Sequence, residues 1–191
     1  MTHFSGAGDI PQPGTSQPLE SLGDRLMYRL AYRNVSGVNY LMVNHSVSPP
    51  GKGASGVRWY LMTVASAGAT PIVQQQGTYA PDSTSRWMAS IAMDKCGDLA
   101  VGYSVSSSAV EPGIRFAGRT LADPANALEP EIHLMDGIAS QTGTAGWGDY
   151  SALRVDPSDD KTFFYTNEYL TSTGNTNWST AVSKVQFTTC H

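Results

Sequence analysis

The sequence contains little charge and no basic excess. Only 15% of its 191 residues are Asp, Glu, Lys or Arg, the formal net charge is −4 at pH 7, and the pI is about 5.4. Nucleic acids and anionic membranes are recognised through basic faces, so the composition argues against both as partners. No apolar run approaches the roughly 18 residues that a membrane-spanning helix requires.

Several chemical motifs are missing as well. The four histidines are not spaced as metal ligands, and the sequence contains no Gly-rich phosphate loop and no Ser/His/Asp signature. We therefore expect no cofactor. The one alternative is Ca²⁺ at the turn 156–160, where three carboxylates lie within five residues, although their spacing does not match an EF-hand loop.

Cysteine is scarce, with Cys96 and Cys190 the only two. A bridge between them and a pair of free thiols both remain open. Cys96 lies in a predicted turn, 94–98, in which the Asp94 side chain should accept backbone N–H groups. The N-terminus has no charged start followed by an apolar stretch, so no signal peptide is visible. The weakly charged, Ser/Thr-rich composition is nevertheless typical of secreted β-proteins, and we expect this location.

A repeat of about sixty residues runs through the chain nearly three times. The segments 26–33, 87–94 and 149–156 align, and their last residues are 61 and 62 positions apart. Gly56-Val57-Arg58-Trp59 recurs as Gly113-Ile114-Arg115-Phe116. Self-similarity at a fixed period of this length is typical of propellers and solenoids.

Each unit contains up to four strand-like stretches separated by turn residues. Four antiparallel strands per repeat describe the blade of a β-propeller. We therefore predict an all-β, β-propeller-type fold of about three four-stranded antiparallel blades, with the last blade incomplete; the alternative is a β-sandwich with coincidental similarity. The expected strands are 25–32, 39–47, 56–64 and 71–76; then 87–93, 99–104, 113–119 and 131–134; and finally 149–155, 162–169 and 177–187.

The predicted organisation places blades at 23–80, 81–141 and 142–191. Residues 1–22 should contribute an outer strand and a linker from a preceding blade. Closed propellers have at least four blades, so three would leave exposed faces and edges that favour association. Further blades or a homodimer would cover them; in the dimer, the strand around Thr2–Ser5 of one copy would complete the last blade of the other.

Several short segments of the sequence resemble the C-terminal blades of secreted bacterial β-propeller proteins. That group is described as sialidase-like or BNR-repeat-like and mostly has no assigned activity. The turns depart from a sialidase Asp-box, and the Arg-Ile-Pro motif of sialidases is absent, so catalytic roles do not carry over. The segments are Gly23-Asp24-Arg25-Leu26-Met27-Tyr28-Arg29, Arg86-Trp87-Met88, Gly102-Tyr103-Ser104-Val105-Ser106-Ser107-Ser108, Trp147-Gly148-Asp149-Tyr150-Ser151 and Tyr165-Thr166-Asn167-Glu168-Tyr169.

The candidate site is the mouth of the central channel, where the first strands of the units begin. Sialidase chemistry requires arginines on a carboxylate and a tyrosine nucleophile with acidic partners. The structural alternatives are an Arg86 ion pair with Asp24 or Asp149 between blades, and tryptophans that pack in the core. The catalytic candidates are Asp149, Tyr150 and Glu168, and the ligand-binding candidates are Arg25, Arg86, Trp87, Trp147 and Asp149.

Two functions follow from this pattern. The first is an extracellular binding or scaffold module that takes a glycan ligand by stacking on Trp87, Trp147 or Trp178. The alternative is a sialidase-like glycoside hydrolase or a polysaccharide lyase acting on extracellular carbohydrate. The enzyme requires Asp149 and Glu168 to lie close together as free acids. If arginines or backbone amides bind both carboxylates, the binding module is favoured.

Overall fold

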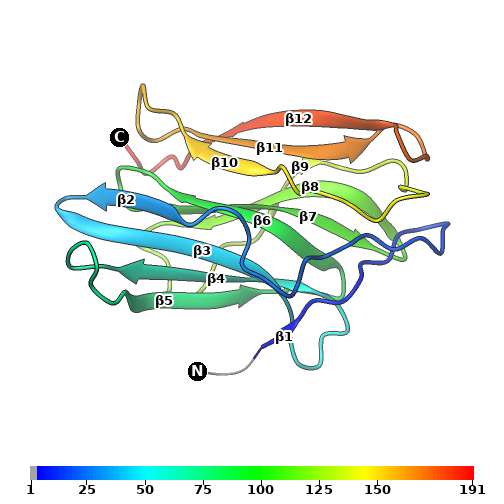
Figure 1. Cartoon of the computed structure of the whole chain (residues 1–191). Helices are drawn as coiled ribbons and strands as arrows, with labels where there is room; N and C mark the ends of the chain where they lie inside the picture. The colour runs from blue at the N-terminus through cyan, green and yellow to red at the C-terminus, as the bar shows by residue number, and fades with distance from the viewer. Residues whose placement is uncertain (1–3) are drawn as a thin grey trace.

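The computed structural model describes residues 4–191 and is built of three antiparallel sheets, which we call the first, second and third blades (Figure 1). The described residues contain no helix, and hence none that could cross a membrane. The first blade comprises β1 (Ser5–Gly6), β2 (Ala31–Val35), β3 (Val38–Ser48), β4 (Gly56–Thr63) and β5 (Ile72–Tyr79). The second comprises β6 (Ser85–Met93), β7 (Leu99–Ser107), β8 (Val110–Arg119) and β9 (Ile132–Met135), and the third β10 (Ala152–Val155), β11 (Phe163–Leu170) and β12 (Trp178–Val185).

The blades stack face to face, with the second blade between the other two (Figure 1). Every residue of β6 is buried, as expected for a strand that is covered on both faces. One face of the second blade packs on the first through residues such as Trp59 and Ile91. Its other face packs on the third through residues such as Phe116 and Leu153. The fold is therefore a partial β-propeller, and its last blade has three strands.

Neighbouring strands pair in sequence order, because short turns connect them. The order in the second blade is β6-β7-β8-β9 and in the third β10-β11-β12. The predicted strands agree closely with the observed ones except for the first strands of the first and third units; the prediction 25–32 overlaps β2 at only two residues. The first unit begins its regular strand at Ala31 rather than residue 25, and the third at Ala152 rather than residue 149. Asp149 and Tyr150 consequently lie in a turn.

The N-terminal segment joins the first blade. Ser5 and Gly6 pair with Ser48 and Val47 at the end of β3, which is longer than its partner β2. The sequence predicted an outer strand that belongs to a preceding blade. In the structure these residues pair with the end of β3 that extends beyond β2. Thr2, which also belonged to that prediction, lies outside the described residues.

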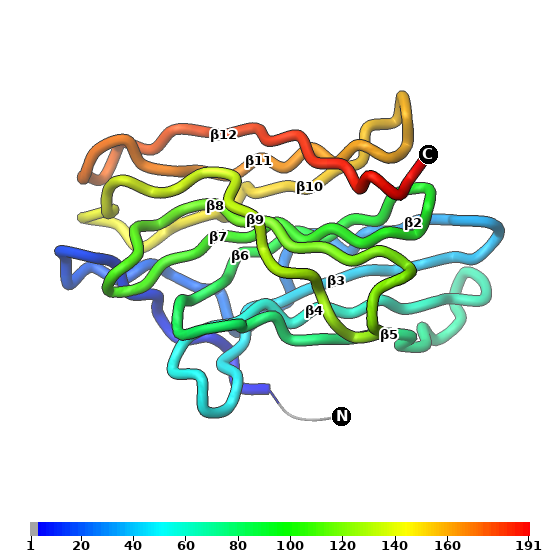
Figure 2. The backbone as a smooth tube through the Cα atoms, turned by 180° about the vertical axis from the view of Figure 1, so that it is seen from behind, coloured from blue at the N-terminus to red at the C-terminus, as the bar shows by residue number. Residues whose placement is uncertain are grey.

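A disulfide joins the turn between β6 and β7 to the end of the chain. Cys96 and Cys190 are bonded, with their Cα atoms 5.7 Å apart, and the C-terminus lies beside that turn in Figure 2. The bond resolves the alternative that the sequence left open. In the same turn Asp94 Oδ1 accepts the N–H groups of Cys96 and Asp98 at 2.9 and 3.0 Å, which confirms its predicted role.

Candidate functional site

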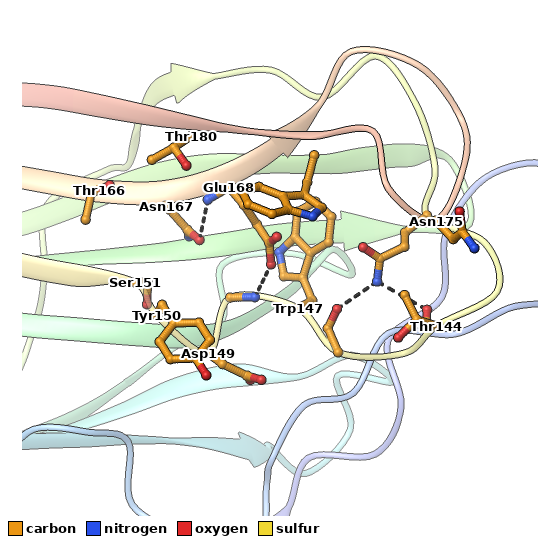
Figure 3. A pocket seen from close by; sticks show the side chains of 14 residues that line it. Thr144, Trp147, Asp149, Tyr150, Ser151, Thr166, Asn167, Glu168, Asn175 and Thr180 are labelled. Carbon is orange, nitrogen blue, oxygen red and sulfur yellow. Dashed lines mark hydrogen bonds between the residues drawn. The ribbon is translucent and has the colours of Figure 1, made fainter.

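A cavity of about 350 Å³ opens on the face of the third blade that points away from the second blade. The turn before β10 forms one wall, and β11 and β12 form the other (Figure 3). Because side chains alternate along a strand, Phe163 and Tyr165 face the second blade, while Thr166 and Glu168 point into the cavity. The lining residues are Gln141, Thr144, Gly146, Trp147, Gly148, Asp149, Tyr150, Ser151, Thr166, Asn167, Glu168, Asn175, Trp178 and Thr180.

Hydrogen bonds fix the loop that carries the first wall. The indole Nε1 of Trp147 donates to Ser104 Oγ in the second blade at 3.0 Å, and the same oxygen accepts Asn167 Nδ2 at 2.9 Å. The Gln141 side-chain amide donates to the carbonyls of Thr144 and Gly146. The protein itself therefore holds the cavity in shape, which lowers the entropic cost of binding.

Two carboxyl groups line the cavity together. Glu168 is partly buried and accepts the backbone N–H of Gly148 (Figure 3). Burial raises the pKa of Glu168, the Gly148 hydrogen bond opposes this shift, and the nearby Asp149 charge adds to it. Asp149 is exposed. Within residues 4–191 neither acid forms an ion pair, so no arginine neutralises them there.

An exposed indole completes the cavity. Trp178 begins β12 and has 58% of its surface exposed, whereas Trp59, Trp87 and Trp147 are almost fully buried. Asn175 and Thr180 also line the cavity and offer amide and hydroxyl groups. β12 alternates exposed and half-buried positions along its length. The strand pattern predicts that Trp178 shares a face with Thr180, but the alternation of residue types does not say which face is open.

The structure brings four of the predicted residues together and separates the others. Trp147, Asp149, Tyr150 and Glu168 line the cavity. Arg25 shares a smaller adjoining cavity with Asp149, but its guanidinium pairs with neighbouring Asp24 at 2.8 Å on the surface.

Arg86 is not part of this cavity. Its guanidinium is buried and pairs with Asp82 at 2.5 Å and Glu131 at 2.6 Å, and Tyr103 also donates to Glu131 at 2.9 Å. Burial opposes the charge of Arg86, but hydrogen bonds and charge from both acids outweigh it and raise the pKa of Arg86. The Arg86 hydrogen bonds hold the pKa of Asp82 at about 2. The predicted pairing with Asp24 or Asp149 was wrong, because Glu131 of the same blade supplies the partner.

Trp87 also lies away from the open cavity. It is buried in a core with Trp147, Ile10 and Leu170. The alternative that Trp87 and Trp147 pack in the core is confirmed, although Trp147 also forms part of the cavity wall.

The acidic turn 156–160 uses its carboxylates within the protein. Asp159 accepts the N–H groups of Lys161 and Thr162, Asp160 pairs with Arg33, and Asp156 accepts the Ser158 N–H. Among the described residues one group of potential metal ligands occurs, Asp94 with Cys96 and Cys190, and its two sulfurs are joined in the disulfide.

Comparison with known proteins gives one structural similarity. No protein-family model and no curated protein matches the sequence. The chain is similar to the crystal structure of a thermostable family-43 glycoside hydrolase, with 14% sequence identity and a TM-score of 0.44. The similarity covers 84% of this chain and 55% of that one, so the chain spans about half the length of the hydrolase.

Proposed function

We propose that the cavity on the open face of the third blade binds carbohydrate and that the chain acts as an extracellular binding module. The observation that carries the proposal is the exposure of Trp178 beside the amide of Asn175 and the hydroxyl of Thr180. A pyranose ring can stack its C–H face on an indole, while its hydroxyl groups bond to the polar groups around it.

The disulfide supports the extracellular location. Structural disulfides persist in oxidising compartments and are rare in the cytosol of most organisms. The Cys96–Cys190 bond closes a loop across the second and third blades, so its reduction would release the end of the chain from the blade that holds it.

Hydrolysis of a glycosidic bond is the second candidate, and the paired acids favour it. Glycosidases use one carboxylic acid to protonate the leaving group and one carboxylate as base or nucleophile. Burial raises the pKa of Glu168, which suits the acid, and the exposed Asp149 suits the second role. In this candidate Tyr150, which is 94% exposed, contacts the sugar at the cavity rim.

Glycan-array screening followed by calorimetry tests the binding proposal. Trp178→Ala should weaken binding about tenfold, because the variant loses the apolar indole surface that the sugar ring would cover, and each Å² of such surface contributes about 25 cal/mol. Val182→Ala is the matched control, since Val182 lies on the same strand, is 70% exposed and does not line the cavity. Equal binding by both variants would exclude this site.

Turnover distinguishes the two candidates. Glycans that bind would be incubated with the chain and the products analysed by chromatography. If the chain is a hydrolase, Glu168→Gln should abolish cleavage and retain binding. Binding without cleavage by the unmodified chain would support the binding module alone. Trp147→Ala gives a further check, because unfolding of this variant would assign Trp147 mainly to the core.

A further inference from the structure

A second cavity, of about 260 Å³, lies where the three blades meet. One segment of each blade lines it: residues 29–33 from the first, 92–93 from the second and 153–155 from the third. It shares no lining residue with the carbohydrate cavity. Three of its lining residues are arginines, and none is acidic.

The three arginines differ in their partners. Arg33 donates from both Nη atoms to the two carboxylate oxygens of Asp160, each at 2.8 Å, and is neutralised. Arg29 and Arg154 have no carboxylate within 4.0 Å in the described part of the chain. Arg154 donates from Nη1 to the carbonyl of Leu153 at 2.6 Å, which leaves most of its N–H groups free.

Arg29 and Arg154 are both exposed, and the Arg29 guanidinium lies 4.9 Å from the centre of the Tyr28 ring. Within residues 4–191 neither has a carboxylate that offsets its charge, so the two guanidinium groups repel each other. Burial lowers the pKa of Arg154, and the positive charge of Arg29 lowers it further. The nearby acid Asp160 is held by Arg33, and Lys95 places another positive charge close to it. This positive region stands out on a chain with a net charge of −4, and an anion between Arg29 and Arg154 would remove the repulsion.

The floor of the cavity is apolar. Ala92, Met93 and Leu153 are 7%, 2% and 0% exposed. Charges beside such a surface are screened less than in open water, and guanidinium groups bind carboxylate and sulfate oxygens through paired N–H donors. The geometry points to an oxyanion site: Arg29 and Arg154 bind a carboxylate or sulfate, either as a free ion or carried on a sugar.

Calorimetry at low and high NaCl tests the site with three probes: inorganic sulfate, glucuronate and glucose. Sulfate or glucuronate should bind, and glucose should not bind at this cavity. Arg29→Gln and Arg154→Gln should each weaken anion binding about tenfold or more, since each removes charge-assisted hydrogen bonds. Salt should weaken binding in the unmodified chain. Binding of sulfate without glucuronate would identify a site for sulfate, and binding of glucuronate without sulfate a site for a carboxylate carried on a sugar.

Two controls separate this site from general charge effects and from the carbohydrate cavity. Arg25→Gln removes an exposed arginine that lies outside the cavity and should leave anion binding unchanged. Trp178→Ala should leave the binding of sulfate unchanged, because sulfate has no sugar ring to stack on the indole. Arg29 is exposed, so Arg29→Gln should fold, and without ligand its melting temperature should be equal or higher because a repulsion is lost. Equal losses in Arg25→Gln and Arg29→Gln, or no anion binding by the unmodified chain, would overturn the proposal.

Discussion

At the scale of single residues, Asp94 shows how a turn side chain supports a blade. Its Oδ1 accepts two backbone N–H groups, and its Oδ2 is buried with no partner among the described residues. Burial raises the pKa of this carboxyl to about 6; the N–H group of Asp98 opposes the shift and the charge of Asp98 adds to it. The ionised form is therefore tolerated at a cost.

We expect Asp94→Ala to lower the free energy of unfolding by about 1 kcal/mol, because the turn loses its acceptor. Chemical denaturation at fixed temperature measures the effect. Ser158→Ala is a suitable control, since Ser158 is exposed in another turn. An unchanged midpoint for Asp94→Ala would contradict the role assigned to the turn.

The pH dependence of that loss has a defined sign. The pKa of Asp94 in the folded state, about 6, lies above the ordinary value of 3.8. The folded state therefore binds the Asp94 proton more tightly than the unfolded state does. This contribution to stability is fully present below pH 3.8 and disappears as the pH rises through about 6. The difference in stability between the unmodified chain and Asp94→Ala should be larger at about pH 4 than at about pH 7. A difference that grows with pH would contradict the raised pKa.

At the scale of strands and sheets, the contact between the second and third blades depends on a glycine, Gly102, which has no side chain. A Cβ atom on Gly102 of β7 would lie 2.6 Å from the ring of Tyr165. Tyr165 is fully buried in β11, so its ring cannot move aside without displacing its neighbours. The blades can approach this closely only with glycine at position 102.

Gly102→Ala should destabilise the fold by about 1–3 kcal/mol, the usual cost of inserting an extra carbon into a packed core. Thermal unfolding followed by near-ultraviolet circular dichroism reports both stability and the environment of Tyr165. Gly8→Ala is the matched control, because no described atom lies within 4 Å of the position that its Cβ would occupy. Equal melting temperatures for the two variants would show that the blades can separate without loss.

At the scale of the whole molecule, both outer blades of the stack carry exposed apolar side chains. On β2 of the first blade and in the segment before it, Leu26, Tyr28, Leu30 and Tyr32 are each more than half exposed. On the third blade Phe164, Trp178 and Val182 are exposed. The apolar faces of the second blade are buried instead, because each packs against a neighbouring blade.

We expect the purified chain to self-associate through these surfaces, with the first blade of one copy against the third blade of another, because large exposed apolar surfaces favour association. Trp178 belongs both to this surface and to the carbohydrate cavity, so a bound glycan should compete with self-association. The exchange of an N-terminal strand is not part of this expectation, since Ser5 and Gly6 pair within their own blade. Light scattering over a range of concentrations measures the assembly, and Leu30→Glu should shift it toward monomer. A monodisperse monomer at micromolar concentration would contradict the expectation.

The sequence by itself determined the repeat, the strands and the turns. Alternating side chains and turn residues act over a few positions, so β3 to β8 and the Asp94 turn could be predicted from local pattern. The strand starts at 31 and 152 could not, because the segments 25–30 and 149–151 contain strand-like residues but lie outside a regular ladder.

Only the tertiary structure decided which side chains form a site. Arg86 and Glu131 are 45 positions apart, and Cys96 and Cys190 are 94 apart, so no local pattern could pair them. The alternation of side chains along a strand assigns Trp178 to one face of its sheet. Whether another element covers that face, or covers Trp147 in the loop before β10, depends on how the blades pack. Trp147 lies in the core beside the second blade and Trp178 stays open, because burial is a property of the packed sheets and not of the strand alone.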